Sequence, residues 1–168
     1  MCTGSGCILL SLMHYSNDCE GMGVDLSAGA LEVAEQNTGR LLDAAKADRV
    51  HFLQSDLFEK VEGKFEIIVS NPPYIASAEV EKLMPEVRDH EPRMALDGTE
   101  DGLYFYRCII EEAGRHLVSS GMLFFEIGYD QGQAVSELMR AQGYCEVQVV
   151  QDYAGLDRVV YGTYVERN

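Results

Sequence analysis

Short apolar runs alternate along the chain with longer stretches in which apolar residues recur every three or four positions. This alternation is typical of strands and helices in turn. The strand-like runs are residues 21–24, 50–53, 65–69, 121–127, 147–150 and 159–164. The helix-like stretches are residues 7–13, 28–47, 102–116 and 131–142, with a short helix and a long loop across 75–101. The order predicts an α/β fold with a mostly parallel sheet and helices on both faces.

The stretch from residue 28 toward Ala47 is the longest predicted helix. Ser27 is its predicted N-cap, because a serine side chain can accept from a free backbone N–H of the first turn. Ala30, Ala34, Asn37 and Leu41 are expected near one face.

Composition fits one domain spanning residues 1–168, since 168 residues with 46% apolar content can bury a sizeable core. The net charge of −15 repels phosphate backbones and argues against nucleic acid as the main partner. Solubility alone is the other explanation of the acid excess. A local acid run could be a solvated helix face or could attract a basic protein. That run is Glu79, Glu81, Glu86, Asp89 and Glu91.

The cysteines and histidines offer no metal or disulfide framework. Five cysteines include no Cys-x-x-Cys pair, and the four histidines show no ligand spacing, so we expect free thiols in a reducing cytoplasm and no metal. No apolar run approaches the roughly 18–20 residues that span a bilayer, and the first residues lack signal-peptide character, so no membrane partner is expected.

Three polar features follow successive strand positions and could together bind one ligand. The Thr3-Gly4-Ser5-Gly6 loop lets backbone approach a ligand closely, and the helix after it offers N–H groups that suit a carboxylate. Asp25 could accept from two ribose hydroxyls, and Asp56 from the exocyclic amine of adenine, with Leu57 against the ring. Taken singly, the features could be a tight turn, a helix cap and a turn former. We include the neighbouring Cys2 and Leu26 in this candidate cofactor site.

Asn71-Pro72-Pro73-Tyr74 is the most specific motif, because a polar asparagine directly ends an apolar strand. An amide nitrogen is a weak nucleophile because its lone pair is delocalised, and two acceptors around its NH₂ group would orient it for attack. The Asn71 side-chain oxygen and the Pro72 carbonyl could be those acceptors, on a stretch that the prolines stiffen. Tyr74 could stack on a flat substrate group. The alternative is a proline-rich turn after a strand.

These motifs resemble the HemK/PrmC family of release-factor glutamine methyltransferases over nearly the whole chain. Residues 3–6 look like its methyl-donor loop, 54–58 like its adenine segment and 70–75 like its substrate-amide site. Residues 91–98, with the sequence Glu-Pro-Arg-Met-Ala-Leu-Asp-Gly, are the most selective match. Residues 101–103, 126–132 and 152–160 complete it.

The resemblance implies a Rossmann-like class I methyltransferase with S-adenosylmethionine as cofactor. It also implies methylation of the glutamine in the Gly-Gly-Gln motif of peptide-chain release factors. Asn71, Pro72 and Tyr74 would be catalytic, and Asn71 would also face the cofactor. Pro73 and Glu91 would join them in binding substrate. The setting would be the cytoplasm of a bacterium, with an organelle left open.

One departure concerns the start of the chain, which lies inside the donor loop. The family's first strand, a central one that ends in an acid, is missing. We therefore expect a truncated chain that folds poorly and binds cofactor weakly, since each buried backbone group left unpaired costs roughly 1–3 kcal/mol.

Two other functions share the motif. One is methylation of an adenine or guanine amine on a flipped base of a nucleic acid. The other is a non-catalytic relative that keeps the fold. The acidity and the 91–98 segment disfavour the first, and the intact Asn71 and Tyr74 disfavour the second.

Overall fold

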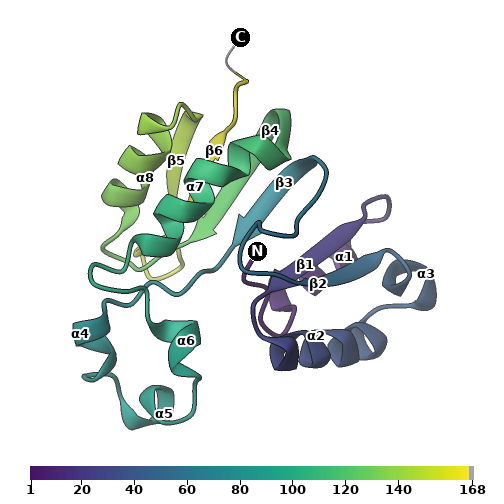
Figure 1. Cartoon of the computed structure of the whole chain (residues 1–168), viewed down its shortest axis with the longest axis horizontal. Coiled ribbons are helices and arrows are strands. Elements are labelled where there is room, and N and C mark those ends of the chain that lie inside the picture. Colours follow the sequence, from purple (N-terminus) through teal and green to yellow (C-terminus); the bar gives the residue numbers. More distant parts are fainter. Residues whose placement is uncertain (167–168) are drawn as a thin grey trace. The chain divides into compact units, whose positions relative to one another are not determined.

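The computed structural model describes residues 1–166 as an alternation of strands and helices, as the sequence predicts (Figure 1). The chain divides into two compact units, Met1–Glu62 and the part from Gly63 onward. Within residues 1–166, no helix has both the length and the apolar character needed to cross a bilayer.

The first unit is a two-stranded parallel sheet covered by helices. Its elements are α1 (Cys7–Tyr15), β1 (Gly21–Asp25), α2 (Ala28–Leu41), α3 (Ala44–Ala47) and β2 (Val50–Gln54). The two strands pair in register from Gly21 with Val50 to Asp25 with Gln54. Gly23 permits this packing, because a Cβ there would lie 2.7 Å from the Phe52 ring. The core of the unit includes Leu10, Met13, Val24, Leu31 and Ala34.

The long helix predicted to run toward Ala47 ends earlier than expected. Ser27 is its N-cap as predicted, with Oγ accepting from Ala30 N at 3.2 Å. Leu42 is extended, and Asp43 then caps the separate helix α3 by accepting from Lys46 N at 3.0 Å. An Asp at this position favours a new cap over a continuous helix.

The buried residues of α2 are Leu31, Ala34 and Thr38, whereas Leu41 is 60% exposed. Thr38 can be buried because its hydroxyl donates to Ala34 O at 2.9 Å, which satisfies the polar group locally.

The second unit carries a mixed four-stranded sheet in the order β3-β4-β6-β5. β3 and β4 are parallel, while β6 is antiparallel to both of its neighbours, so the two closing strands depart from the mostly parallel prediction. The strands are β3 (Phe65–Ser70), β4 (Leu117–Glu126), β5 (Cys145–Gln151) and β6 (Asp157–Thr163). The helices are α4 (Ser77–Val80), α5 (Pro85–Arg88), α6 (Arg93–Leu96), α7 (Tyr104–His116) and α8 (Gly132–Ala141).

Helices α7 and α8 pack on this sheet and on each other, so both cover the same face (Figure 1). In α7 the buried residues recur at three- and four-residue intervals: Tyr106, Ile109, Ile110 and Ala113. Tyr106 meets Phe125 of β4 edge to face, with ring centroids 5.2 Å apart. Burying each large apolar side chain stabilises the unit by roughly 1.5–3 kcal/mol, so this layer fixes β4 and the turns at its ends.

Within residues 1–166, β1 pairs only with β2, and the β3 edge of the second sheet has β4 as its one partner. The described residues thus form two separate sheets, and β3 lies at one edge of the second.

Candidate functional site

The glycine loop of the first unit is held against the end of β1 by its own backbone. Thr3 N donates to Val24 O at 2.9 Å, and Gly4 N donates to the Asp25 carboxylate at 2.8 Å. Gly6 has φ 81°, and a Cβ there would come within 3.2 Å of Ala34 and Leu10, so glycine is required. At Gly4, with φ 52°, no atom lies within 4 Å of the Cβ position, which leaves space open beside the loop.

Asp25 is half-buried and is already oriented by two backbone donors. One carboxylate oxygen accepts from Gly4 N and the other from Ser27 N at 2.9 Å. Asp25 is not the N-cap of α2, because the Ser27 side chain has that role. Each carboxylate oxygen can accept a second hydrogen bond, so a position on each is available for a hydroxyl. These residues fit the ribose of an adenosyl group.

The end of β2 is tied to the end of β1. Ser55 N donates to Asp25 O at 3.1 Å, and Gln54 Nε2 donates to Leu26 O at 3.0 Å. Asp56 is exposed, and its carboxylate has no hydrogen bond within residues 1–166, so it is available to a ligand. Leu57 has φ 44°, a left-handed conformation that is rare for leucine and that turns the chain just after Asp56.

The first unit therefore brings together the predicted cofactor residues from three segments: residues 2–6, 25–26 and 56–57. Cys2 also has positive φ, at 52°. One supporting residue was missed by the sequence analysis: Asn37 of α2 donates from Nδ2 to Ser5 O at 3.0 Å and holds the loop. The sequence analysis placed Asn37 only on one face of a helix, together with Ala30, Ala34 and Leu41.

In the second unit, burial changes from one residue to the next at the start of the motif at residues 71–74. Ser70 and Pro72 are fully buried, whereas Asn71 between them is exposed and its amide has no partner within residues 1–166. Pro72 fixes φ and lacks an N–H, so the corner can present Asn71 outward without losing a backbone hydrogen bond. The corner thus combines a rigid backbone with a polar side chain available to a ligand.

Tyr74 is half-buried at the end of this corner. Burial raises the pKa of its phenol, nearby Glu126 raises it further, and Arg158 partly opposes the shift. The hydroxyl therefore stays protonated near neutral pH. Glycine is required at position 98, because a Cβ there would lie 2.7 Å from Tyr74 Cα.

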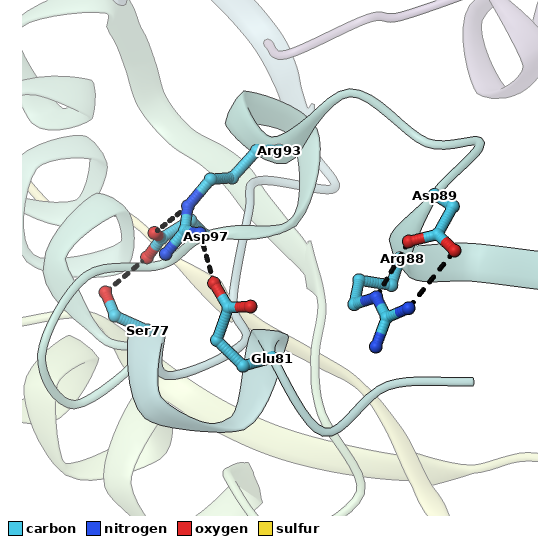
Figure 2. Close-up of polar contacts among 6 residues, drawn as sticks. All are labelled: Ser77, Glu81, Arg88, Asp89, Arg93 and Asp97. Carbon is cyan, nitrogen blue, oxygen red and sulfur yellow. Dashed lines mark hydrogen bonds and ion pairs between the residues drawn. The ribbon is translucent and has the colours of Figure 1, made fainter. Parts of the chain in front are cut away.

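The chain then leaves the sheet as an excursion, residues 76–97, which carries α4, α5 and α6 (Figure 1). Backbone bonds close its neck, from Ile75 N to Leu96 O at 3.0 Å and from Ser77 N to Thr99 O at 2.8 Å. The Asp97 carboxylate reinforces the neck by accepting from Ser77 Oγ at 2.6 Å (Figure 2). It also accepts from Thr99 N at 3.0 Å. These two bonds and Arg93 lower the pKa of Asp97.

Ion pairs inside the excursion use part of the acid run. Arg93 bridges Glu81 and Asp97, and Arg88 binds Asp89 at 2.7 Å (Figure 2). Lys82 binds Glu79 at 2.6 Å. Glu91 is exposed between α5 and α6, and its carboxylate makes no bond within residues 1–166. The predicted substrate residue Glu91 is thus accessible, and its role stays a prediction.

No metal centre is evident within residues 1–166, where no three His, Cys, Asp or Glu side chains are grouped to hold an ion. None of the five cysteines forms a disulfide within residues 1–166. The predicted meeting of the cofactor residues of one unit with Asn71 of the other stays a prediction.

Sequence relatives support the resemblance drawn from the motifs. A relative from Agrobacterium fabrum named "Release factor glutamine methyltransferase" is 46% identical over 159 residues, covering 94% of this chain and 54% of the relative. A relative of the same name from Moorella thermoacetica is 48% identical over 158 residues, covering 93% and 54%. The resemblance is confirmed, and the chain spans about half the length of these relatives.

Solved structures support the fold. A methyltransferase from Pyrococcus furiosus matches with a TM-score of 0.69 at 18% identity, covering 98% of this chain and 72% of that one. An RNA methyltransferase from Salinibacter ruber in complex with S-adenosyl-L-homocysteine matches with a TM-score of 0.58 at 17% identity, covering 99% and 79%. The predicted class, a Rossmann-like class I methyltransferase fold, is confirmed.

A family model described as "Methyltransferase small domain" matches residues 1–88. Because that match covers more than half of the 168 residues and agrees with the fold, the chain belongs to the methyltransferase small domain family.

Proposed function

We propose that this protein methylates the side-chain amide nitrogen of the glutamine in the Gly-Gly-Gln motif of a peptide-chain release factor, with S-adenosylmethionine as methyl donor. The observation that carries the proposal is the corner at residue 71. It holds an exposed amide, without a partner in the described chain, between two fully buried neighbours. The names of the relatives, which are 39–48% identical, support the same substrate.

On the donor side, the first unit would hold the cofactor through groups whose geometry is already set. Asp25 would accept the ribose hydroxyls, Asp56 the adenine amine, and the open side of Gly4 would admit the rest of the ligand. Cys2, Leu26 and Leu57 would line the same site. When bound, S-adenosylmethionine supplies an electrophilic methyl group.

On the acceptor side, the second unit would orient the flat substrate amide. The Asn71 side-chain oxygen and the Pro72 carbonyl would each accept one N–H of the glutamine NH₂ group. Two fixed acceptors leave the nitrogen a single direction of approach, which is how alignment speeds a reaction of a weak nucleophile. Tyr74, kept neutral by its raised pKa, would pack against the amide plane, and no covalent enzyme intermediate is required.

The partner would be the release factor itself, a protein that acts in translation and would place this enzyme in the cytoplasm. A nucleic-acid substrate is disfavoured by the net charge of −15, because phosphate backbones are bound by basic surfaces. The fold similarity to an RNA methyltransferase, at 17% identity, does not bear on the substrate. A membrane partner is not part of the proposal.

The test is methyl transfer with labelled donor to three acceptors: a release factor, the same factor with its Gly-Gly-Gln glutamine changed to Glu, and single-stranded DNA or RNA. We expect label only on the unchanged release factor. Label on nucleic acid would establish the alternative amino-methyltransferase. Label on none of them would refute enzymatic activity of this chain and favour a non-catalytic relative.

A further inference from the structure

Gln131 precedes the first residue of α8, at the position where a side chain usually caps a helix. Ser, Thr, Asp and Asn are preferred there because their short side chains reach the free N–H groups of the first turn. Gln131 makes no such cap bond. Its amide binds three other segments of the second unit instead, which marks it as a residue with another task.

The two ends of the Gln131 amide bind opposite kinds of group. Nε2 donates to Tyr74 O at 2.9 Å and to Gly102 O at 3.3 Å, while Oε1 accepts from Gly128 N at 3.0 Å. Carbonyls can only accept and a backbone N–H can only donate, so the orientation of the amide is fixed by its partners. One side chain thereby joins the 71–74 motif, the segment after the excursion and the turn after β4.

The backbone around this amide leaves no room for a side chain at Gly102 or Gly128. A Cβ at Gly102 would lie 2.3 Å from Tyr74 O and 2.9 Å from Gln131 Nε2, and one at Gly128 would lie 2.9 Å from Gln131 Oε1. The Tyr106 hydroxyl lies 3.4 Å from Gln131 Oε1 and donates to Glu126 O at 3.0 Å. Because α7 and β4 are buried, the turn that holds Gln131 is anchored in the core.

We propose that Gln131 is the positioning residue for the substrate-amide corner: by holding the Tyr74 carbonyl it fixes the direction in which Asn71 and the Pro72 carbonyl point. The inference rests on the proposed methyl transfer. Gln131 itself acts through the backbone of residue 74 and not on the substrate. Its donation to Tyr74 is the one side-chain bond to the backbone of residues 71–74 that the described chain shows.

Gln131→Glu tests this with little change in shape. The ionised carboxylate would place an oxygen against two carbonyl oxygens and repel both, whereas the protonated acid could donate to one of them. We expect kcat to fall about 10- to 100-fold at pH 8, the scale of a small misplacement of reacting groups. The loss should shrink as the pH is lowered and the carboxyl group protonates. Cofactor affinity should change less than twofold, since the donor residues lie in the other unit.

Two further variants separate positioning from charge and from simple destabilisation. Gln131→Met removes the bonds without adding charge, so its loss of kcat should be independent of pH. Gln142→Glu makes the same charge change at an exposed position whose side chain has no bond within residues 1–166, and should retain kcat within twofold. Urea unfolding of each variant identifies any that is poorly folded.

The outcomes distinguish this inference from the proposed function. If the unaltered chain methylates the release factor and Gln131→Glu keeps its kcat at every pH, Gln131 is not a positioning residue and the proposed function stands. If the unaltered chain shows no transfer, the proposed function fails and hydrogen exchange decides the role of Gln131. Faster exchange of the Ile75 and Gly98 amides in Gln131→Met would support the positioning role of Gln131, and unchanged exchange would overturn it.

Discussion

The two units differ in how they hold the polar side chain at the end of a strand. Asp25, at the end of β1, has both carboxylate oxygens bonded to backbone N–H groups of its own unit. Asn71, just after β3, has no partner within the described chain, although its neighbours are buried and its corner is bonded through Tyr74. One side chain is fixed directly and the other only through its backbone.

The difference follows from what each group would bind. A carboxylate has spare acceptor capacity, so it can be held by the protein and still receive hydroxyl groups. The amide of Asn71 has one oxygen to offer, and holding it within the protein would compete with the substrate. Fixing the backbone instead keeps the oxygen available at little entropic cost on binding.

The largest effect is expected from removing the free amide. Asn71→Ala should lower kcat for methyl transfer about 10²- to 10³-fold, as for loss of one preorganised polar group at a reacting centre. Cofactor affinity should change far less, because the other predicted donor-site residues lie in the first unit. The measurement is single-turnover transfer of labelled methyl together with calorimetric binding of the donor.

Asn17→Ala is the matched control, since Asn17 is exposed and its side chain has no bond within residues 1–166. It should keep full activity. An Asn71→Ala protein with unchanged turnover would remove Asn71 from the catalytic residues and leave the corner a plain proline turn.

A second variant tests whether the acceptor corner depends on its backbone packing. Gly102→Ala would put a methyl group 2.3 Å from Tyr74 O at a φ of 72°. Gly155→Ala is the matched control. Its φ of 78° is similarly unfavourable for alanine, but no atom lies within 4 Å of the added Cβ. Overpacking costs about 1–3 kcal/mol, so the free energy of unfolding should fall by that much more for Gly102→Ala. If urea titrations show equal losses of unfolding free energy for the two variants, the corner adjusts to the added methyl group without cost.

A third variant probes the donor side. In Asp25→Asn one end of the side chain becomes an NH₂ group, which must face the N–H of either Gly4 or Ser27. Losing a charged hydrogen bond should weaken donor binding about tenfold or somewhat more. Asp18→Asn, at an exposed position without a side-chain bond in residues 1–166, should bind normally. Equal affinities of the two variants in calorimetry would rule out the assigned role of Asp25.

The sequence predicted the positions of the strands and the candidate side chains well because these depend on local pattern. The buried strand before Asn71 and the acid after residues 21–24 were visible as apolar runs with a polar end. The prediction that α2 would reach Ala47 was wrong because a single Asp43 cap outweighs continuing helix propensity.

Long-range contacts could not be predicted in the same way. Gln131 bonds Tyr74 across 57 positions, and Asn37 bonds Ser5 across 32, and neither pairing leaves a periodic signal in the chain. The antiparallel insertion of β6 between β4 and β5 is also a choice of topology that the apolar runs leave open.

The smallest effect on stability is expected at Asp101. It precedes Gly102, whose carbonyl accepts from Gln131. Arg107 binds its carboxylate at 2.8 and 3.0 Å, and with Leu103 N it lowers the pKa of Asp101 to about 2. A lowered pKa means that the pair stabilises the fold above the unfolded value of 3.8. That contribution is lost as the pH falls through about 2. The pair is exposed, so solvent screening keeps it below about 1 kcal/mol.

In Asp101→Asn the free energy of unfolding should therefore depend less steeply on pH between 4 and 2, as urea titrations at several pH values would measure. Asp130→Asn, which removes an exposed carboxylate without a bond in residues 1–166, should keep the original slope. If the pH dependence of the unfolding free energy is reduced equally in both variants, the cause is the general loss of negative charge and not the Arg107 pair. If only Asp101→Asn does, the Arg107 ion pair supports the acceptor side, whereas both oxygens of Asp25 accept from backbone N–H groups.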